Sequence, residues 1–162
     1  MSSKAARRRE QRAKTTVESA GQPRIQTILY SLAAIVALAG LADAIYLTIA
    51  HLAGQHVVCG GAAQCDEVLA SKYATVFGQP VAAFGALGYF TVFSLATLSA
   101  FGHLRPRLPL ALLVGVMFIG TLWFLYVQAF ILRAYCQYCL LSAACTFVIA
   151  GLLLAIPPRR AT

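Results

Sequence analysis

The chain has 162 residues, of which 60% are hydrophobic and 11% are charged, with a formal net charge of +8 and a mean hydropathy of +0.76. Soluble domains typically carry about 25% charged residues, so the composition excludes a soluble globular domain. It predicts an integral membrane protein. The positive charges are segregated along the chain, and we expect them to reflect membrane orientation rather than a nucleic-acid partner.

Four apolar runs predict four membrane-spanning helices, because about 20 residues suffice to cross the hydrocarbon core. The polar residues 1–24, which include Gly21 and Pro23, predict a disordered basic tail. The first run is longer than the roughly 7–15 apolar residues of a secretory signal, so it predicts a retained span. The fold class is thus an all-α, four-helix membrane bundle over residues 25–156, followed by a short tail at 157–162. The expected spans are 25–50, 78–101, 108–132 and 136–156.

The lysines and arginines fix the expected orientation of this bundle. Cytoplasmic loops carry an excess of these residues, so both termini and the middle connection around His103 to Pro106 are expected to be cytoplasmic. Lys72 and Arg133 are the exceptions on the opposite side. The cytoplasmic set is Lys4, Arg7, Arg8, Arg9, Arg12, Lys14, Arg24, Arg105, Arg107, Arg159 and Arg160.

A loop from His51 to Phe77 joins the first two spans, and loops this long are usually functional. Its first half is small and glycine-containing. Its second half, Asp66 to Phe77, predicts an amphipathic helix on the membrane surface. The apolar face of that helix would consist of Val68, Leu69, Tyr73, Val76 and Phe77.

Asp43 is the anomaly within the first span. A carboxylate near the centre of a membrane helix costs roughly 2.5–3.5 kcal/mol on insertion scales. Two interpretations stay open: a proton relay, with Arg133 as a candidate partner, or a structural polar group near the interface.

Four of the five cysteines are expected at the extracytoplasmic face. Cys136 and Cys139 open the last span at i, i+3 spacing, where a helix N-terminus favours a thiolate at Cys136. Cys59 and Cys65 lie in the long loop that meets this helix end. The two pairs predict a thiol–disulfide relay from an external dithiol to an acceptor in the bilayer. The fifth, Cys145, lies deeper in the last span and has no expected role.

Other interpretations of the cysteines compete with the relay. A structural disulfide explains Cys59 and Cys65 alone, and buried small residues would explain the last pair. Zinc would use four thiolates, but structural zinc usually occupies compact water-soluble modules, and we expect no metal. As a different class of function, the chain could be a non-enzymatic membrane subunit or assembly factor braced by its loop disulfide.

The order of these motifs resembles the bacterial vitamin K epoxide reductase family. The resemblance covers residues 25–156, in a stand-alone form without a fused thioredoxin-like domain. It rests on the four spans, the loop pair C-x5-C, the stretches CDEVLAS (65–71) and GQPVAAFG (78–85), and CQYC (136–139). It implies a membrane oxidoreductase of the bacterial inner membrane. Such an enzyme oxidises a separate thioredoxin-fold, DsbA-like protein and passes the electrons to a quinone, menaquinone or ubiquinone.

The resemblance also implies residue roles. Cys136 and Cys139 match the active-site pair, with Cys139 nearest the quinone. Cys59 matches the loop cysteine that meets the external partner, and Cys65 the one that exchanges with Cys136. Ser71 matches a serine that hydrogen-bonds a quinone carbonyl, and the pocket-side aromatics are Phe84 and Tyr89.

Two departures from the animal members of the family concern the substrate. Their pocket tyrosine is replaced by Ala143, and an asparagine near the start of their second span by Val81. Both differences favour a plain quinone over an epoxide. A second class of four-span quinone-linked oxidases carries its CxxC pair in the first external loop, and the reversed order in this chain argues against that class.

Overall fold

The chain folds into a bundle of helices capped at one end by a short loop assembly. The computed structural model describes residues 2–55, 57, 59–60, 65–101 and 107–156. Side chains are described from Arg24 onward, except for that of Arg107. In chain order the elements are α1 (Ser2–Leu52), α2 (Cys65–Leu69), β1 (Thr75–Val76), β2 (Gln79–Pro80), α3 (Val81–Ala100), α4 (Arg107–Tyr126), the π-helix η1 (Val127–Leu132) and α5 (Gln137–Ala155).

Four helical segments in the described part of the chain are long and apolar enough to cross a membrane. They are Arg24–Leu52, Val81–Ala100, Leu108–Leu132 and Gln137–Ala155. Their bounds agree with the four predicted spans, so the expected all-α membrane bundle is confirmed. Their outward side chains are largely apolar and exposed, as expected where lipid replaces water as the solvent.

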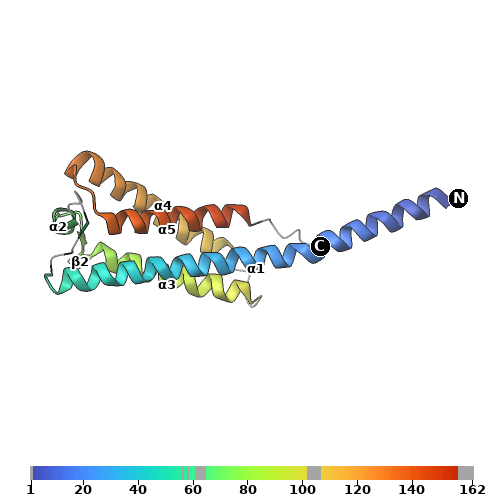
Figure 1. The fold of residues 1–162 in the computed structure, drawn as a ribbon, viewed down its shortest axis with the longest axis horizontal. Coiled ribbons are helices and arrows are strands. Elements are labelled where there is room, and N and C mark those ends of the chain that lie inside the picture. The colour runs from blue at the N-terminus through green and yellow to red at the C-terminus, as the bar shows by residue number, and fades with distance from the viewer. Residues whose placement is uncertain (1, 56, 58, 61–64, 102–106, 157–162) are drawn as a thin grey trace.

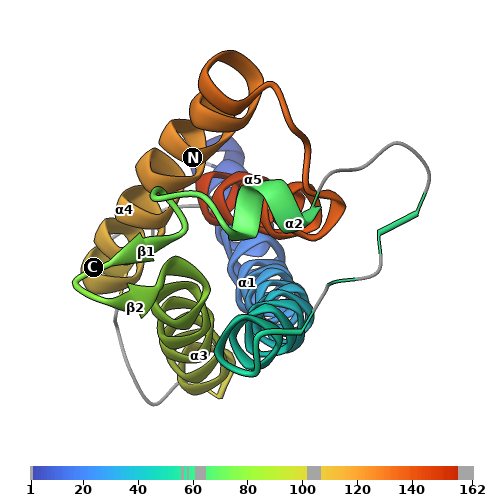
Figure 2. The ribbon, with the colours of Figure 1, turned by 90° about the vertical axis from the view of Figure 1, so that its left-hand side faces the viewer.

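The four spans pack as a ring. α1 contacts α3 and α5, and α4 contacts α5 and α3, an arrangement visible along the bundle axis in Figure 2. Since the spans alternate in direction, the segment after α1 and the start of α5 come together at one end of the bundle. α2 and β2 lie at that end (Figure 1).

Small residues allow α1 to approach its neighbours closely. Ala33, Ala37 and Ala44 on α1 are buried against the bundle, and at Gly40 an added Cβ would lie 2.6 Å from the ring of Tyr89 on α3. In membranes, where apolar burial drives association weakly, such close backbone approach supplies much of the packing energy.

The N-terminal segment differs from the expected disordered tail. The backbone of α1 is helical from Ser2, and its blue N-terminal part projects beyond the other helices in Figure 1. The segment is rich in alanine, arginine, lysine, glutamate and glutamine, which have high helix propensity. The expectation of disorder rested on the polarity of this segment, whereas its helix propensity favours the observed helix.

The long loop also differs from its prediction, because its helix ends eight residues early. α2 covers only Cys65–Leu69, and the chain then turns into an antiparallel hairpin in which Val76 pairs with Gln79. Phe77 and Gly78 form the turn with φ of 53° and 75°, the left-handed conformations that a tight hairpin requires. Phe77 is therefore 97% exposed at the tip, and the predicted single apolar face does not form.

Two predicted features lie outside the described residues. These are the basic turn from His103 to Pro106 and the tail at 157–162.

Candidate functional site

The end of the third span positions the first cysteine of the CQYC motif. η1 ends at Arg133, whose backbone is left-handed at φ 52° and ψ 30°, so the predicted short turn before α5 is present. The side-chain oxygen of Gln128 on η1 accepts a hydrogen bond of 3.0 Å from the backbone N–H of Cys136. Gln128 is buried, so this bond holds Cys136 firmly at the start of α5.

Cys136 is the N-cap residue of α5. Its sulfur accepts a hydrogen bond of 3.4 Å from the backbone N–H of Cys139. Helix N-termini present unpaired N–H groups that stabilise a negative charge. The arrangement therefore places the Cys136 sulfur where a thiolate is favoured.

The electrostatics of this cap agree with its geometry. The pKa of the Cys136 thiol is lowered to about 7, chiefly because the Cys139 thiol hydrogen-bonds to it. The N–H groups of Cys139 and Tyr138 act in the same direction, and burial opposes them. A thiol whose pKa lies near neutral pH is a reactive nucleophile.

The loop supplies the second pair of sulfurs. Cys59 and Cys65 form a disulfide with their Cα atoms 6.2 Å apart, and Cys65 is the first residue of α2. Two hydrogen bonds hold the loop around this disulfide. The N–H of Val57 donates to Oδ1 of Asp66 at 3.0 Å, and that of Gly60 donates to Oε1 of Gln137 at 3.2 Å. The second bond ties the loop directly to the start of α5.

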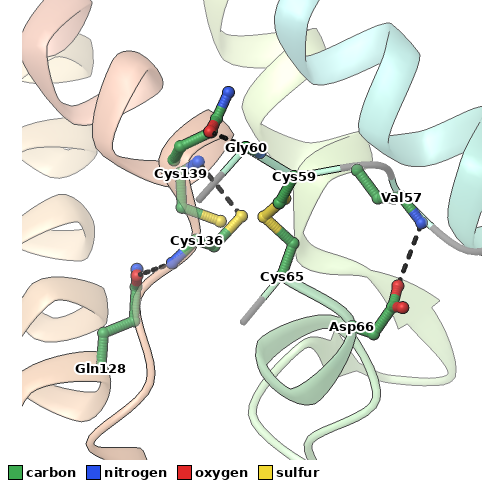
Figure 3. Close-up of a disulfide and its surroundings, with 9 residues drawn as sticks. Val57, Cys59, Gly60, Cys65, Asp66, Gln128, Cys136 and Cys139 are labelled. Atoms are coloured by element: carbon green, nitrogen blue, oxygen red, sulfur yellow. Dashed lines mark hydrogen bonds between the residues drawn. A yellow bond between two sulfur atoms is a disulfide. The ribbon is translucent and has the colours of Figure 1, made fainter. Parts of the chain in front are cut away.

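The two pairs meet in one packed cluster. Cys65 and Cys136 are both buried in it, with 1% and 0% of their surfaces exposed, and Cys59 and Cys139 pack against it. Figure 3 shows the Cys136 sulfur directed toward the disulfide, with the Cys139 sulfur beside it on the far side. In this structure Cys136 and Cys139 are free thiols. The site thus holds one oxidised and one reduced pair in contact.

A cavity of about 470 Å³ lies between the spans, and Cys139 is one of its lining residues. Ligand pockets of this size and mostly apolar lining are typical for small organic molecules. Its walls come from α1, α2, α3, α4 and α5, and α2 contributes Val68 and Leu69. Cys139 therefore links the thiol cluster to an apolar cavity in the membrane part.

Two of the three predicted pocket residues line the cavity, and the third does not. Phe84 and Tyr89 both line the cavity, and Tyr89 is buried. Ser71 does not line it, and its hydroxyl donates to the backbone carbonyl of Val68 at 2.7 Å. Ser71 would have to release that carbonyl before it could donate to a ligand.

Among the described residues, no group of three or more histidine, cysteine, aspartate or glutamate side chains is arranged to hold a metal ion. Cys59 and Cys65 are bonded to each other.

Comparison with known proteins identifies the family of the chain and one relative. The model of the vitamin K epoxide reductase family matches residues 31–154. This range holds the loop pair, the CQYC motif, the second and third spans, and most of the first and fourth spans. The chain belongs to the vitamin K epoxide reductase family. It is also 32% identical over 114 residues to the thiol-disulfide oxidoreductase LTO1 of Arabidopsis thaliana. That match covers 65% of this chain and 30% of the relative, so the chain spans less than a third of the length of LTO1.

Both departures from the animal members of the vitamin K epoxide reductase family fall on the cavity wall. Ala143 and Val81 line it, so the lining is apolar at the two positions where the resemblance implies polar side chains in the animal members. The remaining hydroxyls at its α5 side belong to Ser142 and Thr146.

Three residues that shape the candidate site were not predicted from the sequence. They are Gln128, which holds Cys136, Gln137, which holds Gly60, and Asp66, which holds Val57. Gln128 carried a usable signal, because a polar side chain within an apolar span is usually buried and functional. The other two are ordinary loop-edge residues whose roles depend on contacts distant in sequence.

Proposed function

We propose that this protein is a membrane thiol oxidoreductase that oxidises an extracytoplasmic dithiol protein of the thioredoxin fold and passes the electrons to a quinone in the bilayer. The observation that supports this most directly is Cys139, which packs in the thiol cluster and also lines the apolar cavity. The similarity to LTO1, a thiol-disulfide oxidoreductase, supports the same chemistry.

The proposed electron path begins at the loop. A donor thiolate attacks Cys59, forms a mixed disulfide and releases Cys65. The second donor thiol attacks the mixed disulfide, so that the donor leaves oxidised and the loop holds two thiols. Cys65 then attacks Cys136 of an oxidised Cys136–Cys139 pair and releases Cys139. Attack by Cys59 on the Cys65–Cys136 bond re-forms the loop disulfide. After this step the loop would hold a disulfide and α5 two free thiols. The structure has the same arrangement of bonds, with Cys59 bonded to Cys65 and with Cys136 and Cys139 free.

The cavity fits a quinone headgroup by size and lining. A bound quinone would supply an acceptor for two electrons and two protons. Phe84 would pack against its ring, and the hydroxyl at Ser71 or those on α5 would orient its carbonyl oxygens. Cys139 would present its sulfur to the ring, and α2 would cover the cavity at the loop end and exclude water.

We further propose that the protein resides in the bacterial cytoplasmic membrane with both termini in the cytoplasm. The excess of lysine and arginine before the first span supports this orientation. It places the cysteine pairs in the compartment where protein disulfides persist.

The test is anaerobic reduction of menaquinone and ubiquinone analogues by the purified protein, with a reduced thioredoxin-fold dithiol protein as donor. Replacement of Cys59, Cys65, Cys136 or Cys139 by serine is expected to abolish turnover. Cys145→Ser is the matched control, because Cys145 is a buried free thiol outside the cluster, and it should retain activity. Normal turnover in Cys136→Ser and Cys139→Ser would instead identify a non-enzymatic membrane subunit with a structural loop disulfide.

A further inference from the structure

Asp43 is a buried acidic side chain that the electron path does not use. It lies within the span Arg24–Leu52 and is 8% exposed. Its Oδ2 atom is buried and has no hydrogen-bond partner among the described residues. An acidic group in this position is costly, and such residues usually line functional pathways. Helix packing alone does not account for it.

The neighbours of Asp43 on α1 locate its side chain between α3 and α5. One turn before it, Gly40 contacts the ring of Tyr89 on α3. One turn after it, the ring of Tyr46 lies 5.2 Å from that of Tyr138, within the CQYC motif of α5. Residues three apart share a helix face, so Asp43 lies between these two contacts.

Asp43 also lies beside the cavity and the thiols. The next residue, Ala44, lines the cavity, as do Leu47 one turn on and Cys139. Several titratable groups on the packed helices lie within range of the Asp43 charge. They are Tyr89 on α3 and Cys136, Tyr138, Cys139 and Cys145 at the start and middle of α5.

Three hydrogen-bonded hydroxyls on α3 and α5 lie at the cavity wall. The Tyr89 hydroxyl donates to the Ser142 carbonyl at 2.6 Å and lies 3.0 Å from Ser142 Oγ and 2.8 Å from Thr146 Oγ1. All three residues line the cavity. We call the Tyr89, Ser142 and Thr146 hydroxyls the hydroxyl trio. Linked hydroxyls can pass a proton by exchanging donor and acceptor roles.

We propose that Asp43 carries the proton that leaves Cys139 and delivers it through the hydroxyl trio to the ligand in the cavity, an inference that rests on the proposed quinone-reducing function. Oxidation of the Cys136 and Cys139 thiols removes two electrons and two protons as the S–S bond forms, and the acceptor takes up two of each. The Asp43 carboxylate takes the Cys139 proton and is regenerated when it passes the proton on. The Cys136 proton goes to water at the loop end, and water supplies the acceptor's second proton.

The first test compares Asp43→Asn with the wild-type full-length protein. General acid–base groups typically contribute factors of 10² to 10⁴, so we expect quinone reduction to fall by at least about 10-fold. Reduction of the Cys59–Cys65 disulfide by the donor should be unchanged, because that exchange occurs outside the cavity. Asp43→Glu should restore part of the rate. The matched control is Thr48→Val on α1, and it should behave as wild type, because within the described part of the chain the Thr48 hydroxyl bonds its own helix at the Ala44 carbonyl.

The second test does not depend on quinone. Infrared difference spectra between the dithiol and disulfide states of the quinone-free protein, oxidised with diamide, should contain a carboxyl signal that is lost in Asp43→Asn. A wild-type spectrum without that signal, or an Asp43→Asn rate within about twofold of wild type, would overturn the proposal. If the wild-type protein reduces no quinone at all, the proposed function fails, and the spectrum still decides whether Asp43 exchanges a proton with the thiol pair.

Discussion

At the scale of single residues, the chemistry depends on how differently two neighbouring thiols are placed. Cys136 is the N-cap of α5, where it accepts a backbone N–H and contacts the loop disulfide cluster. Cys139 lies one turn into the helix and lines the cavity. The i, i+3 spacing keeps both sulfurs on one helix face, so Cys136 lies within the loop cluster while Cys139 packs against that cluster and also lines the cavity.

The nucleophilicity of Cys136 is the first prediction. With its pKa lowered to about 7, about half of the thiol is ionised at pH 7, compared with about 1% for a thiol at the ordinary value of 9.0. Alkylation of Cys136 by iodoacetamide should therefore rise as the pH increases through about 7. In Cys139→Ala the thiolate loses its main hydrogen-bond donor, so the midpoint should move to higher pH.

Peptide mass spectrometry across a pH series measures this alkylation residue by residue. Cys145→Ala provides the matched control and should leave the midpoint of Cys136 unchanged. A Cys136 midpoint near 9 in the wild-type protein would contradict the role of the helix cap.

At the scale of elements, Tyr89 on α3 fixes the contact between α1 and α3. Gly40 lets the Tyr89 ring lie against the α1 backbone, and the Tyr89 hydroxyl is fixed on α5 by Ser142 and Thr146. Three helices are thereby joined through one side chain. The ring has no room to retreat, because moving it breaks its hydrogen bonds to α5.

Gly40→Ala should therefore destabilise the bundle. The added Cβ would lie 2.6 Å from the Tyr89 ring, and overpacking of this kind costs about 1–3 kcal/mol. Thermal unfolding in detergent, followed by the fluorescence of Trp123, measures the effect. Gly151→Ala on α5 is the matched control, since its new Cβ would meet nothing within 4 Å, and alanine favours a helix by up to about 1 kcal/mol. Equal melting temperatures for the two variants would contradict this account of the contact.

At the scale of the whole molecule, the alternating spans bring the thiol pairs to one end of the bundle. Residues 59–65 and 136–139 are distant in sequence, yet the first pair packs against the second. The start of the α1 span and the end of α5 lie at the other end (Figure 1). The redox centre and the basic N-terminal segment therefore belong to opposite sides of a membrane.

Membrane orientation is the last prediction. In a variant without native cysteines, Lys72→Cys should react with a membrane-impermeant maleimide added to intact cells, because Lys72 is exposed near the loop end. Arg24→Cys, at the opposite end of the α1 span, should react only after the membrane is permeabilised. Labelling of Arg24→Cys from outside would reverse the orientation and place the thiols in the cytoplasm.

The sequence by itself determined the class of fold, the four spans and the identity of the thiol pairs. Hydrophobic runs of sufficient length leave a chain few alternatives in lipid, because backbone polar groups must be satisfied within each helix. The CxxC spacing likewise predicts that both sulfurs lie on one face of a helix, because residues three apart in a helix are neighbours. The helical N-terminal segment shows the limit of that reasoning, since polarity and helix propensity pointed in different directions there.

The tertiary structure decided the rest. It placed Cys139 on a cavity wall, assigned Gln128 to the Cys136 cap, and ended α2 at Leu69 in favour of a hairpin. The cavity wall depends on spans that meet only in the packed bundle, whereas Gln128 lies eight residues before Cys136 and α2 ends close to the hairpin that follows it. A cavity formed between helices leaves no periodic pattern in any one helix, so the sequence of a single span could not have located it. The polar Gln128 within an apolar span was, by contrast, a usable signal.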